Sequence, residues 1–374
     1  MAQRRLPNFM YEYLEGGADQ ELTLRRNQAI LNECLLQPRM AVDATKTDTS
    51  TSLFGAPLRM PVVIAPTGFN GMLWRHGDLE IARAAAGENI PAAQSTVSMS
   101  TIEDVSAVKG LRHWFQLYAY GGLPMAERLL ERALAAGSEA LVITIDGAVA
   151  GNRLWDQRNY VSRGKLNLRS KLDILRHPHW LRNVLLKDGP PNFVNLYEFV
   201  SQKNPDVFTM GRWVAGNRPV LSWDDIRRLR QLWPRKLVIK GILRVDEANT
   251  AASLGADAII LSNHGGRQAE PAISPVEVIA ELRRSLGPAF TIMVDSGFRT
   301  GTQLAVALAL GANAVMVGRA VLYGLAAAGQ PGVAKALGIL ESEFRRTLAL
   351  LGVHSVAELS PDLISRCHGS VHHS

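Results

Sequence analysis

The sequence contains very little cysteine, since Cys34 and Cys367 are the only two among 374 residues. Two cysteines so far apart supply neither a disulfide framework nor the close spacing of a metal site. We therefore expect reduced cysteines, a reducing compartment and no bound metal.

Other signals are missing as well. No run of about 18 apolar residues is present, which argues against a membrane-spanning helix. The first residues, MAQRRLPNFMYEYLEGG, carry basic side chains but no apolar core and no small-residue cleavage site, so a signal peptide is not expected. The chain also lacks a GxGxxG turn after a strand and a GK[ST] phosphate loop, which disfavours cofactor binding in the manner of the dinucleotide folds.

The composition is that of a globular protein. Hydrophobic residues make up 47% of the chain and charged residues 20%, so a large core can form. A length of 374 residues suits two average domains or one α/β barrel with insertions. The net charge of +7 is concentrated in one place, because residues 158–187 contain eight basic residues and one acid, a difference of +7.

Eight short apolar runs rich in Val and Ile alternate with amphipathic stretches such as residues 121–137 and 244–255. The runs scarcely alternate polar with apolar residues, which is typical of parallel strands covered on both faces. This order predicts a (β/α)8 TIM barrel of the α/β class, with a doubly wound sheet as the structural alternative. The predicted strands are residues 61–65, 91–95, 114–118, 140–146, 236–242, 258–263, 291–296 and 314–319.

The alternation fails once, between Asp146 after the fourth strand and a helix predicted to begin near Ser222. A gap of this length predicts a lid or a long basic insertion, which we place at residues 158–219. Its central sequence, KLDILRHPHWLRNVLLK (171–187), mixes Leu, Ile and Trp with cations. The pattern suits an amphipathic segment on an anionic membrane surface, and equally a solvated lid packed against the barrel.

In such a barrel the functional side chains lie at the C-terminal ends of the strands. Lys240 is unusual there, because a lysine inside a buried strand needs an anionic or electron-rich partner. The partner is either a barrel carboxylate such as Asp146 or Asp295, or a cofactor that becomes negatively charged.

The loops after the last two predicted strands are rich in glycine. DSGFRTG (295–301) and GANAVMVGRA (311–320) together match the usual phosphate site of these barrels, where backbone N–H groups and a helix N-terminus bind the anion. Arg299 and Arg319 would add charged donors to a phosphate.

The stretch LSNHGGRQ (261–268) follows the sixth predicted strand. His264 is suited to act as a general base, and Arg267 to grip a carboxylate through two parallel N–H bonds. Gly265 and Gly266 allow a tight turn close to a flat ligand. The alternative is a capping histidine and a surface arginine that follow a strand.

The motifs LPNFMYEYLEGGA, MPVVIAPTGFNG, WFQLY, TIDGAVAGNR, VIKGI, SNHGGRQ, DSGFRTG and VGRA occur in this order along almost the whole chain. In this respect the sequence resembles the FMN-dependent α-hydroxy acid dehydrogenases and oxidases. The resemblance implies a single domain over residues 1–374 that uses FMN to oxidise an L-2-hydroxy acid to the 2-oxo acid.

The resemblance also implies residue roles. His264 would take a proton from the substrate, Asp146 would orient His264, and Lys240 would stabilise the reduced flavin ring; with Tyr118 these form the implied catalytic group. The implied substrate-binding residues are Tyr13, Gly68, Tyr118, Arg153 and Arg267. The residues implied to line the flavin ring are Ala65, Pro66, Thr67, Ser95, Gln116, Thr144, Lys240 and Ser262. Those implied to hold the ribityl chain and phosphate are Asp295, Ser296, Gly297, Arg299, Gly318 and Arg319.

Within the family, the sequence looks most like the mandelate and lactate dehydrogenase branch. Val97 stands where some relatives have a bulkier aromatic residue, so we expect a mandelate-like or otherwise sizeable substrate side chain, with lactate as the second candidate. Gly68 and the basic insertion resemble the membrane-associated dehydrogenases. They favour a peripheral contact through residues 165–190 on the cytoplasmic side of the inner membrane, and a quinone or other membrane electron acceptor.

The alternatives are a soluble cytoplasmic enzyme and an oxygen-using oxidase that produces hydrogen peroxide. A third interpretation, from another class, is a basic barrel that binds nucleic acid or membrane without turnover. The resemblance implies a homotetramer and no nucleic-acid partner.

Overall fold

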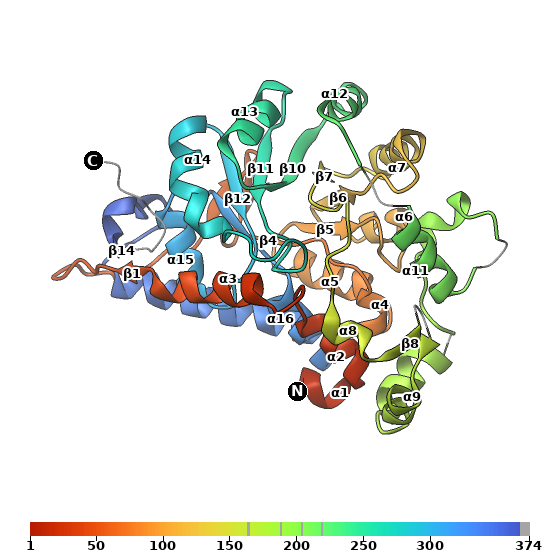
Figure 1. Ribbon diagram of the computed structural model, residues 1–374. Coiled ribbons are helices and arrows are strands. Elements are labelled where there is room, and N and C mark those ends of the chain that lie inside the picture. The colour runs from red at the N-terminus through yellow and green to blue at the C-terminus, as the bar shows by residue number, and fades with distance from the viewer. Residues whose placement is uncertain (163–164, 188, 203–204, 218–219, 367–374) are drawn as a thin grey trace.

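The computed structural model describes residues 1–162, 165–187, 189–202, 205–217 and 220–366. Eight parallel strands close into a barrel in the order β10-β11-β12-β13-β4-β5-β6-β7 (Figure 1). Pairing between β7 and β10 closes the sheet, which confirms the predicted (β/α)8 barrel and excludes the doubly wound alternative. The barrel strands are β4 (Val62–Ile64), β5 (Ala92–Ser95), β6 (His113–Leu117), β7 (Ala140–Thr144), β10 (Lys236–Ile242), β11 (Ala258–Leu261), β12 (Thr291–Val294) and β13 (Ala314–Val317).

The apolar runs form these strands because both of their faces are buried. One face fills the barrel interior with side chains such as Val63, Val142, Val238, Ile260 and Met293. The other face packs against the surrounding helices in a second, larger apolar cluster. Two buried faces account for the near absence of polar alternation.

The helices outside the barrel include the two that the sequence predicted within residues 121–137 and 244–255. Helix α12 begins with a capping box between Ser222 and Asp225, at the predicted start. The outer helices are α5 (Gly77–Gly87), α6 (Ile102–Ser106), α7 (Leu123–Ala135), α12 (Trp223–Leu232), α13 (Val245–Ser253), α14 (Ile279–Leu286), α15 (Gly301–Ala309) and α16 (Arg319–Leu350). Helix α4 (Asn70–Leu73) is a single turn after β4, and η3 (Pro275–Val278), η4 (Val356–Glu358) and η5 (Pro361–Leu363) are 3-10 turns.

A hairpin of β2 (Thr51–Leu53) and β3 (Ala56–Leu58) closes the N-terminal end of the barrel. Leu53 and Leu58 belong to the barrel's interior cluster. The ring of Phe54 lies 5.6 Å from the ring of Trp114 on β6. The hairpin therefore fills this end of the barrel.

Helices α1 (Ala2–Arg5), α2 (Asn8–Glu15) and α3 (Leu22–Glu33) run along the side of the barrel that also carries α16 (Figure 1). After them, β1 (Leu35–Leu36) pairs with β14 (Ile364–Arg366). Cys34 is disulfide-bonded, so the expectation of a reduced cysteine is wrong at this position. Spacing along the sequence could not indicate that β1 and β14 lie side by side; Cys367 lies outside the described residues.

The segment between β7 and α12 folds into several short elements. Its helix α9 lies at the edge of the molecule below the barrel in Figure 1. Trp180 donates to the carbonyl of Met72 at 2.7 Å, and Asp173 accepts from the backbone N–H of Asn8 at 2.6 Å, so the segment is tied to the barrel and to α2. Its elements are α8 (Leu154–Gln157), β8 (Tyr160–Ser162), β9 (Lys165–Leu166), α9 (Leu168–Leu175), α10 (Pro178–Trp180), the π-helix η1 (Leu181–Leu186), the 3-10 helix η2 (Val194–Phe199) and α11 (Val207–Gly216).

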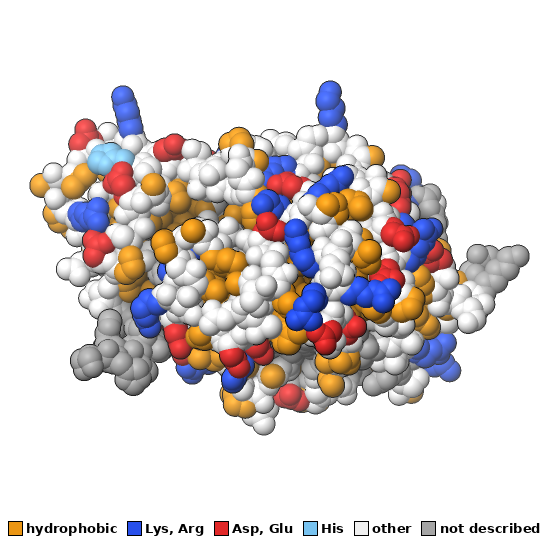
Figure 2. Space-filling view, turned by 90° about the horizontal axis from the view of Figure 1, so that it is seen from above, with side chains coloured by type: hydrophobic (Ala, Val, Ile, Leu, Met, Phe, Trp, Pro, Cys, Tyr) orange, Lys and Arg blue, Asp and Glu red, His pale blue; other side chains and the backbone are white. Residues whose placement is uncertain are grey.

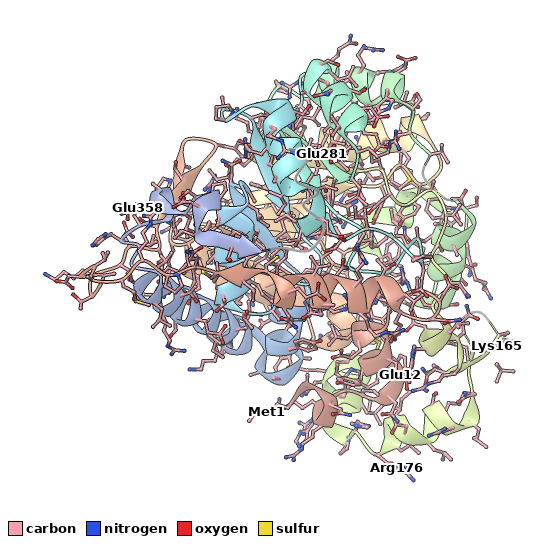
Figure 3. All side chains as sticks on the ribbon, turned by 60° about the vertical axis from the view of Figure 1, so that its left-hand side comes forward. Met1, Glu12, Lys165, Arg176, Glu281 and Glu358 are labelled. Atoms are coloured by element: carbon pink, nitrogen blue, oxygen red, sulfur yellow. The ribbon has the colours of Figure 1, made fainter. Side chains whose placement is uncertain are left out.

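Two views, Figure 2 and Figure 3, show where charged side chains lie on the surface. On the face seen from above in Figure 2, acidic and basic side chains are intermingled. In Figure 3, Lys165 and Arg176 lie at the outer edge of the molecule. None of the helices in the described residues is both long and apolar enough to cross a membrane.

Candidate active site

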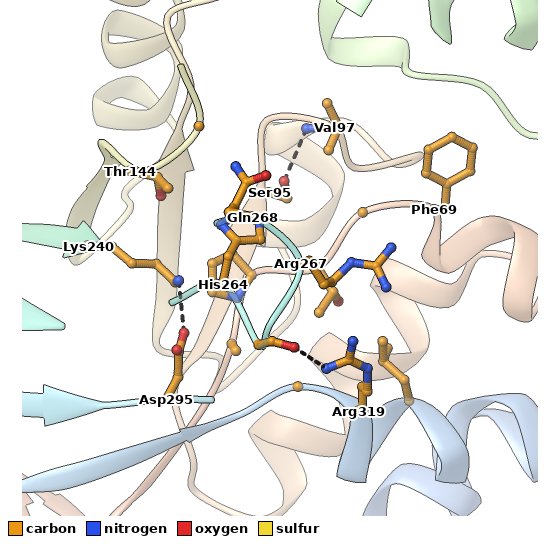
Figure 4. Close-up of a pocket in the computed structure, with 18 of the residues that line it drawn as sticks. Phe69, Ser95, Val97, Thr144, Lys240, His264, Arg267, Gln268, Asp295 and Arg319 are labelled. Carbon is orange, nitrogen blue, oxygen red and sulfur yellow. Dashed lines mark hydrogen bonds and ion pairs between the residues drawn. The ribbon is translucent and has the colours of Figure 1, made fainter. Parts of the chain in front are cut away.

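A cavity of about 320 Å³ opens at the C-terminal ends of the barrel strands. Lys240 reaches it from β10, and His264 and Arg267 reach it from the loop after β11 (Figure 4). The cavity therefore lies where a (β/α)8 barrel places its chemistry. The lining includes most of the predicted site residues: Tyr13, Ala65, Pro66, Thr67, Gly68, Ser95, Tyr118, Thr144, Arg153, Lys240, His264, Arg267, Asp295, Ser296, Gly297, Arg299, Gly318 and Arg319.

The other predicted residues, Gln116, Asp146 and Ser262, support the lining from behind. The hydrogen bonds that join them to it are 2.9, 3.0 and 2.7 Å long and lead to Ser95, His264 and Lys240 respectively. Gln116 and Ser262 are thus one step further from the cavity than predicted, whereas Asp146 lies beside His264, as predicted.

Lys240 occupies an inward-facing position of β10, two residues after Val238 of the barrel interior. Its Nζ lies 2.8 Å from Oδ2 of Asp295 and donates to Oγ of Ser262 at 2.7 Å. Burial alone would lower the pKa of Lys240, but the carboxylates of Asp295 and then Asp146 outweigh it and raise the pKa above its usual value. Lys240 is therefore a fixed positive charge in the wall of the cavity.

His264 lies between a carboxylate and a phenol. Its Nδ1 is 3.0 Å from Oδ1 of Asp146, and its Nε2 is 3.3 Å from the hydroxyl of Tyr118. A carboxylate only accepts hydrogen bonds, so we assign the ring proton to Nδ1. Nε2 then keeps its lone pair, as a general base requires.

The groups around His264 are held in suitable charge states. Burial would raise the pKa of Asp146, but His264 and Lys240 outweigh it and lower the pKa, so this carboxyl is ionised. Burial, followed by the charges of Tyr120 and Asp146, raises the pKa of Tyr118 well above its usual value, so its hydroxyl stays protonated. Tyr118 is therefore a neutral donor over the physiological range.

Two arginines approach the same part of the cavity. Nη1 of Arg267 donates to the carbonyls of Tyr13 and Gly16 at 2.8 and 2.7 Å. Its Nη2, like Nε of Arg153, is buried and has no hydrogen-bond partner in the part of the chain that the structure describes. Burial, and next the charge of Arg153, lowers the pKa of Arg267 to about 9. Two partly buried arginines, with the carboxylate of Asp156 nearby, thus keep unpaired donors that suit an anion.

The far end of the cavity is formed by the loops after β12 and β13. Helix α16 begins at Arg319 directly after β13, with Gly318 at its N-cap. The guanidinium of Arg319 donates to the carbonyls of Leu14, Gly265 and Gly16 at 2.8, 3.0 and 2.8 Å. Arg319 is thus also a structural bridge from α16 to the N-terminal segment and the His264 loop, which the sequence did not indicate.

The insertion also contributes to the lining, through Phe193 and through Gly211, Val214 and Ala215 of α11. No local pattern predicts this, because it depends on how the segment folds back over the barrel. Gln268, within the quoted motif, was also missed. Its side chain donates to the carbonyl of Asp146 at 2.7 Å and accepts from the N–H of Gly151 at 2.9 Å, which ties the loop after β7 to the His264 loop.

The mouth of the closed barrel thus holds a histidine, a neutral phenol donor and two neighbouring arginines, a set of groups suited to removing a proton from an anionic substrate. The chain matches the FMN-dependent dehydrogenase family over residues 2–366, and it belongs to that family.

Individual relatives are similar along nearly their whole length. The chain is 40% identical over 366 residues to an L-lactate dehydrogenase of Xanthomonas euvesicatoria pv. vesicatoria (strain 85-10), covering 98% of this chain and 94% of that protein. It is 39% identical over 365 residues to an L-lactate dehydrogenase of Alcaligenes faecalis, covering 98% and 96%. Among solved structures, it resembles the monotopic membrane protein (S)-mandelate dehydrogenase with a TM-score of 0.92 and 39% identity, covering 97% and 96%.

The cavity suits the FMN that the family uses. Nε2 of Gln116 and Oγ1 of Thr144 are buried without a hydrogen-bond partner among the described residues, although buried polar groups are normally satisfied. Both come from strands next to the cavity, as expected for groups that bond to a polar ring. Lys240 supplies a cation on one side of the cavity, and the start of α16 supplies backbone N–H groups near Arg319, where a phosphate is favoured.

Proposed function

We propose that this chain is an FMN-dependent (S)-2-hydroxy acid dehydrogenase that converts its substrate to the 2-oxo acid. The observation that carries the proposal is the placement of His264, with Nδ1 bonded to Asp146 and Nε2 directed to Tyr118 beside the cavity. His264 takes a proton of the substrate at Nε2, and Asp146 stabilises the imidazolium that forms. Bound FMN supplies the two-electron acceptor.

Arg267 and Arg153 hold the carboxylate of the substrate. Their unpaired donors, Nη2 and Nε, account for this role, since an anion would satisfy both and relieve the repulsion between the two cations. The hydroxyls of Tyr13 and Tyr118 add neutral donors to the carboxylate or the substrate hydroxyl. The phenol oxygen of Tyr13 is 3.5 Å from the carbonyl oxygen of Gly68, close to the lining.

Lys240, kept protonated by its pairing with Asp295, would stabilise negative charge on a bound flavin ring. The ring would be held by Ala65, Pro66, Thr67, Ser95 and Thr144 of the lining, with Gln116 and Ser262 directly behind them. The family resemblance implies that Asp295, Ser296, Gly297, Arg299, Gly318 and Arg319 would hold the ribityl chain and phosphate. The arrangement follows the family resemblance, and the lining is compatible with it.

The substrate carries an aromatic or sizeable apolar side chain, and lactate is the second candidate. Support comes from the apolar part of the lining, where Phe69, Val97, Tyr120, Phe193 and Val214 face the same cavity as His264. The rings of Phe69 and Phe193 meet edge to face, with centroids 4.8 Å apart, and leave a wall suited to an aromatic group.

The electrons pass to a quinone or another membrane carrier, and the enzyme attaches peripherally to the cytoplasmic side of the inner membrane. Helix α9 supports this attachment. Leu168, Leu172 and Leu175 share one face of α9 and are 72%, 52% and 64% exposed, and Arg169 and Lys171 stand between them. An apolar stripe between cations is typical of a helix at an anionic interface. Assembly as a homotetramer rests on the family resemblance alone.

The test is anaerobic mixing of the flavin-loaded protein with a panel of 2-hydroxy acids in both enantiomers. We expect the flavin absorbance to bleach with an (S)-acid, fastest with mandelate or another large side chain. Variant His264→Ala should keep its flavin and lose at least about 100-fold in bleaching rate, as general bases usually contribute. No bleaching with any acid would overturn the proposal.

The alternative function is an oxidase that uses oxygen. Admitting air to the bleached protein separates the two functions, because a dehydrogenase should stay reduced for many turnover times and an oxidase should regain its colour and release hydrogen peroxide. A quinone added without oxygen should restore the colour of the dehydrogenase.

A further inference from the structure

The loop that carries His264 has an unusual backbone. His264, Gly265 and Gly266 have φ values of 59°, 66° and 73°, a run of three left-handed residues. For a residue with a Cβ this conformation costs about 1 kcal/mol or more and persists only where the surroundings hold it. The position of the base therefore depends on the contacts made by its loop.

Two serine hydroxyls hold this loop through its backbone. Oγ of Ser262 accepts from the N–H of His264 at 3.0 Å. Oγ of Ser296, which follows β12, accepts from the N–H groups of Gly265 at 3.0 Å and Asn263 at 3.3 Å. The backbone N–H groups of Asn263, His264 and Gly265 are thus all bound by these two serine side chains.

Both hydroxyls also connect to Lys240. Nζ of Lys240 donates to Oγ of Ser262 at 2.7 Å and lies 2.8 Å from Oδ2 of Asp295. The other carboxylate oxygen of Asp295 accepts from the hydroxyl of Ser296 at 2.7 Å. Ser262, Lys240, Asp295 and Ser296 are all buried, so these bonds are shielded from water. These bonds form a continuous hydrogen-bond network from Lys240 to the backbone of the loop that carries His264.

The conformation of Ser296 indicates that its hydroxyl is needed. Its φ is 77°, a conformation that glycine adopts at lower cost. A hydroxyl has one proton to donate and two lone pairs, and Ser296 uses all three, on Asp295, Gly265 and Asn263. The side chain therefore has no capacity left for a cofactor, although the resemblance implies that Ser296 holds the ribityl and phosphate.

We propose that Ser296 and Ser262 are positioning residues. They fix the backbone of the catalytic base, His264, and connect it to Lys240 through hydrogen bonds and the Asp295 carboxylate. The inference rests on the proposed function of His264. Lys240 then has a second role, because its bonds to Ser262 and Asp295 help to hold the loop that carries the proton acceptor His264.

The decisive variant is Ser296→Gly, which suits the positive φ of this position and removes the hydroxyl together with its Cβ. It is loaded with FMN, and flavin bleaching is followed anaerobically in a single turnover against substrate concentration. We expect the limiting bleaching rate to fall about 10- to 100-fold, because small displacements of reacting groups cost this much. The apparent substrate Kd should change less than about twofold, because Arg153 and Arg267 are untouched, and the bleaching amplitude per flavin should stay complete.

Ser262→Ala should behave in the same way, and Ser138→Ala is the matched control. Ser138 is equally buried and hydrogen-bonds to His113, outside the cavity lining. Its variant should keep the wild-type bleaching rate per flavin even if it melts at a lower temperature. A Ser296→Gly enzyme with the wild-type rate would overturn the proposal, and so would one that cannot retain FMN, because the side chain would then serve the cofactor. If the wild type itself does not bleach, the proposed function fails instead.

Discussion

At the scale of single residues, Gly68 and Val97 form a pair whose packing the structure makes explicit. A Cβ built on Gly68 would lie 2.8 Å from Cγ2 of Val97 and 3.8 Å from the hydroxyl of Tyr13. Real Cβ atoms do not approach other carbon atoms so closely, so an alanine at position 68 requires Val97 to move. The sequence indicated that Gly68 matters within the family, but not that Val97 occupies the space.

The pair can be tested with a double-mutant cycle. Gly68→Ala should destabilise the flavin-loaded protein by about 1–3 kcal/mol, the usual cost of overpacking. The double variant Gly68→Ala with Val97→Ala should recover most of this loss, because the clash is removed. Denaturant unfolding of the four proteins measures the coupling, and additive effects within about 0.5 kcal/mol would contradict it.

The contrast between His264 and Ser296 shows what the sequence reveals about single residues. His264 and Arg267 could be predicted because a base and a fixed cation next to two glycines have few structural explanations. Ser296 could not be given its loop contacts, because they join the ends of two different strands and depend on the registry of the barrel.

At the scale of elements, the apolar stripe of α9 gives a prediction for membrane binding. The double variant Leu172→Glu with Leu175→Glu should reduce co-sedimentation with vesicles of anionic phospholipid at least about 10-fold. It removes apolar side chains that the membrane would bury, and it adds negative charges that the anionic lipid repels. Leu232→Glu on α12 is the matched control, since Leu232 is 45% exposed on another helix. The bleaching rate of each variant reports whether the barrel has folded. Equal sedimentation of the wild type and the α9 variant would remove the case for this contact.

The sequence predicted the barrel strands and the presence of a long insertion, but not the elements inside the insertion. All eight apolar runs became strands, because a parallel strand buried on both faces leaves a continuous apolar signature. Within residues 158–219 the elements are short and include a π-helix, so hydrophobic periodicity carries little signal there. Contacts of α11 with the cavity depend on this irregular path, which is why Val214 was missed.

At the scale of the whole molecule, the N-terminal segment completes the cavity. Backbone carbonyls of Tyr13, Leu14 and Gly16 accept four hydrogen bonds from Arg267 and Arg319. Charge-assisted bonds of this kind are stronger than neutral ones, and the arginines lose them if the segment is removed.

Deletion of residues 2–17 should therefore weaken flavin retention. We expect the ratio of flavin to protein absorbance after desalting to fall by more than about half, because the two partly buried guanidinium groups lose four of their hydrogen bonds. Deletion of residues 2–7, which removes α1 but keeps these carbonyls, is the control and should retain more flavin. Equal retention by the two truncated proteins would contradict this role of the segment.

The same N-terminal contacts have a consequence for synthesis on the ribosome. Tyr13 leaves the exit tunnel 254 residues before Arg267, and Leu14 leaves it 305 residues before Arg319. Contacts between residues so far apart in the sequence form slowly. Strand β1 likewise cannot pair until β14 has been translated. Helices α1 and α2 are thus translated long before the residues to which they dock, so we expect the nascent barrel to be unable to hold its cofactor until the chain has emerged beyond Arg319.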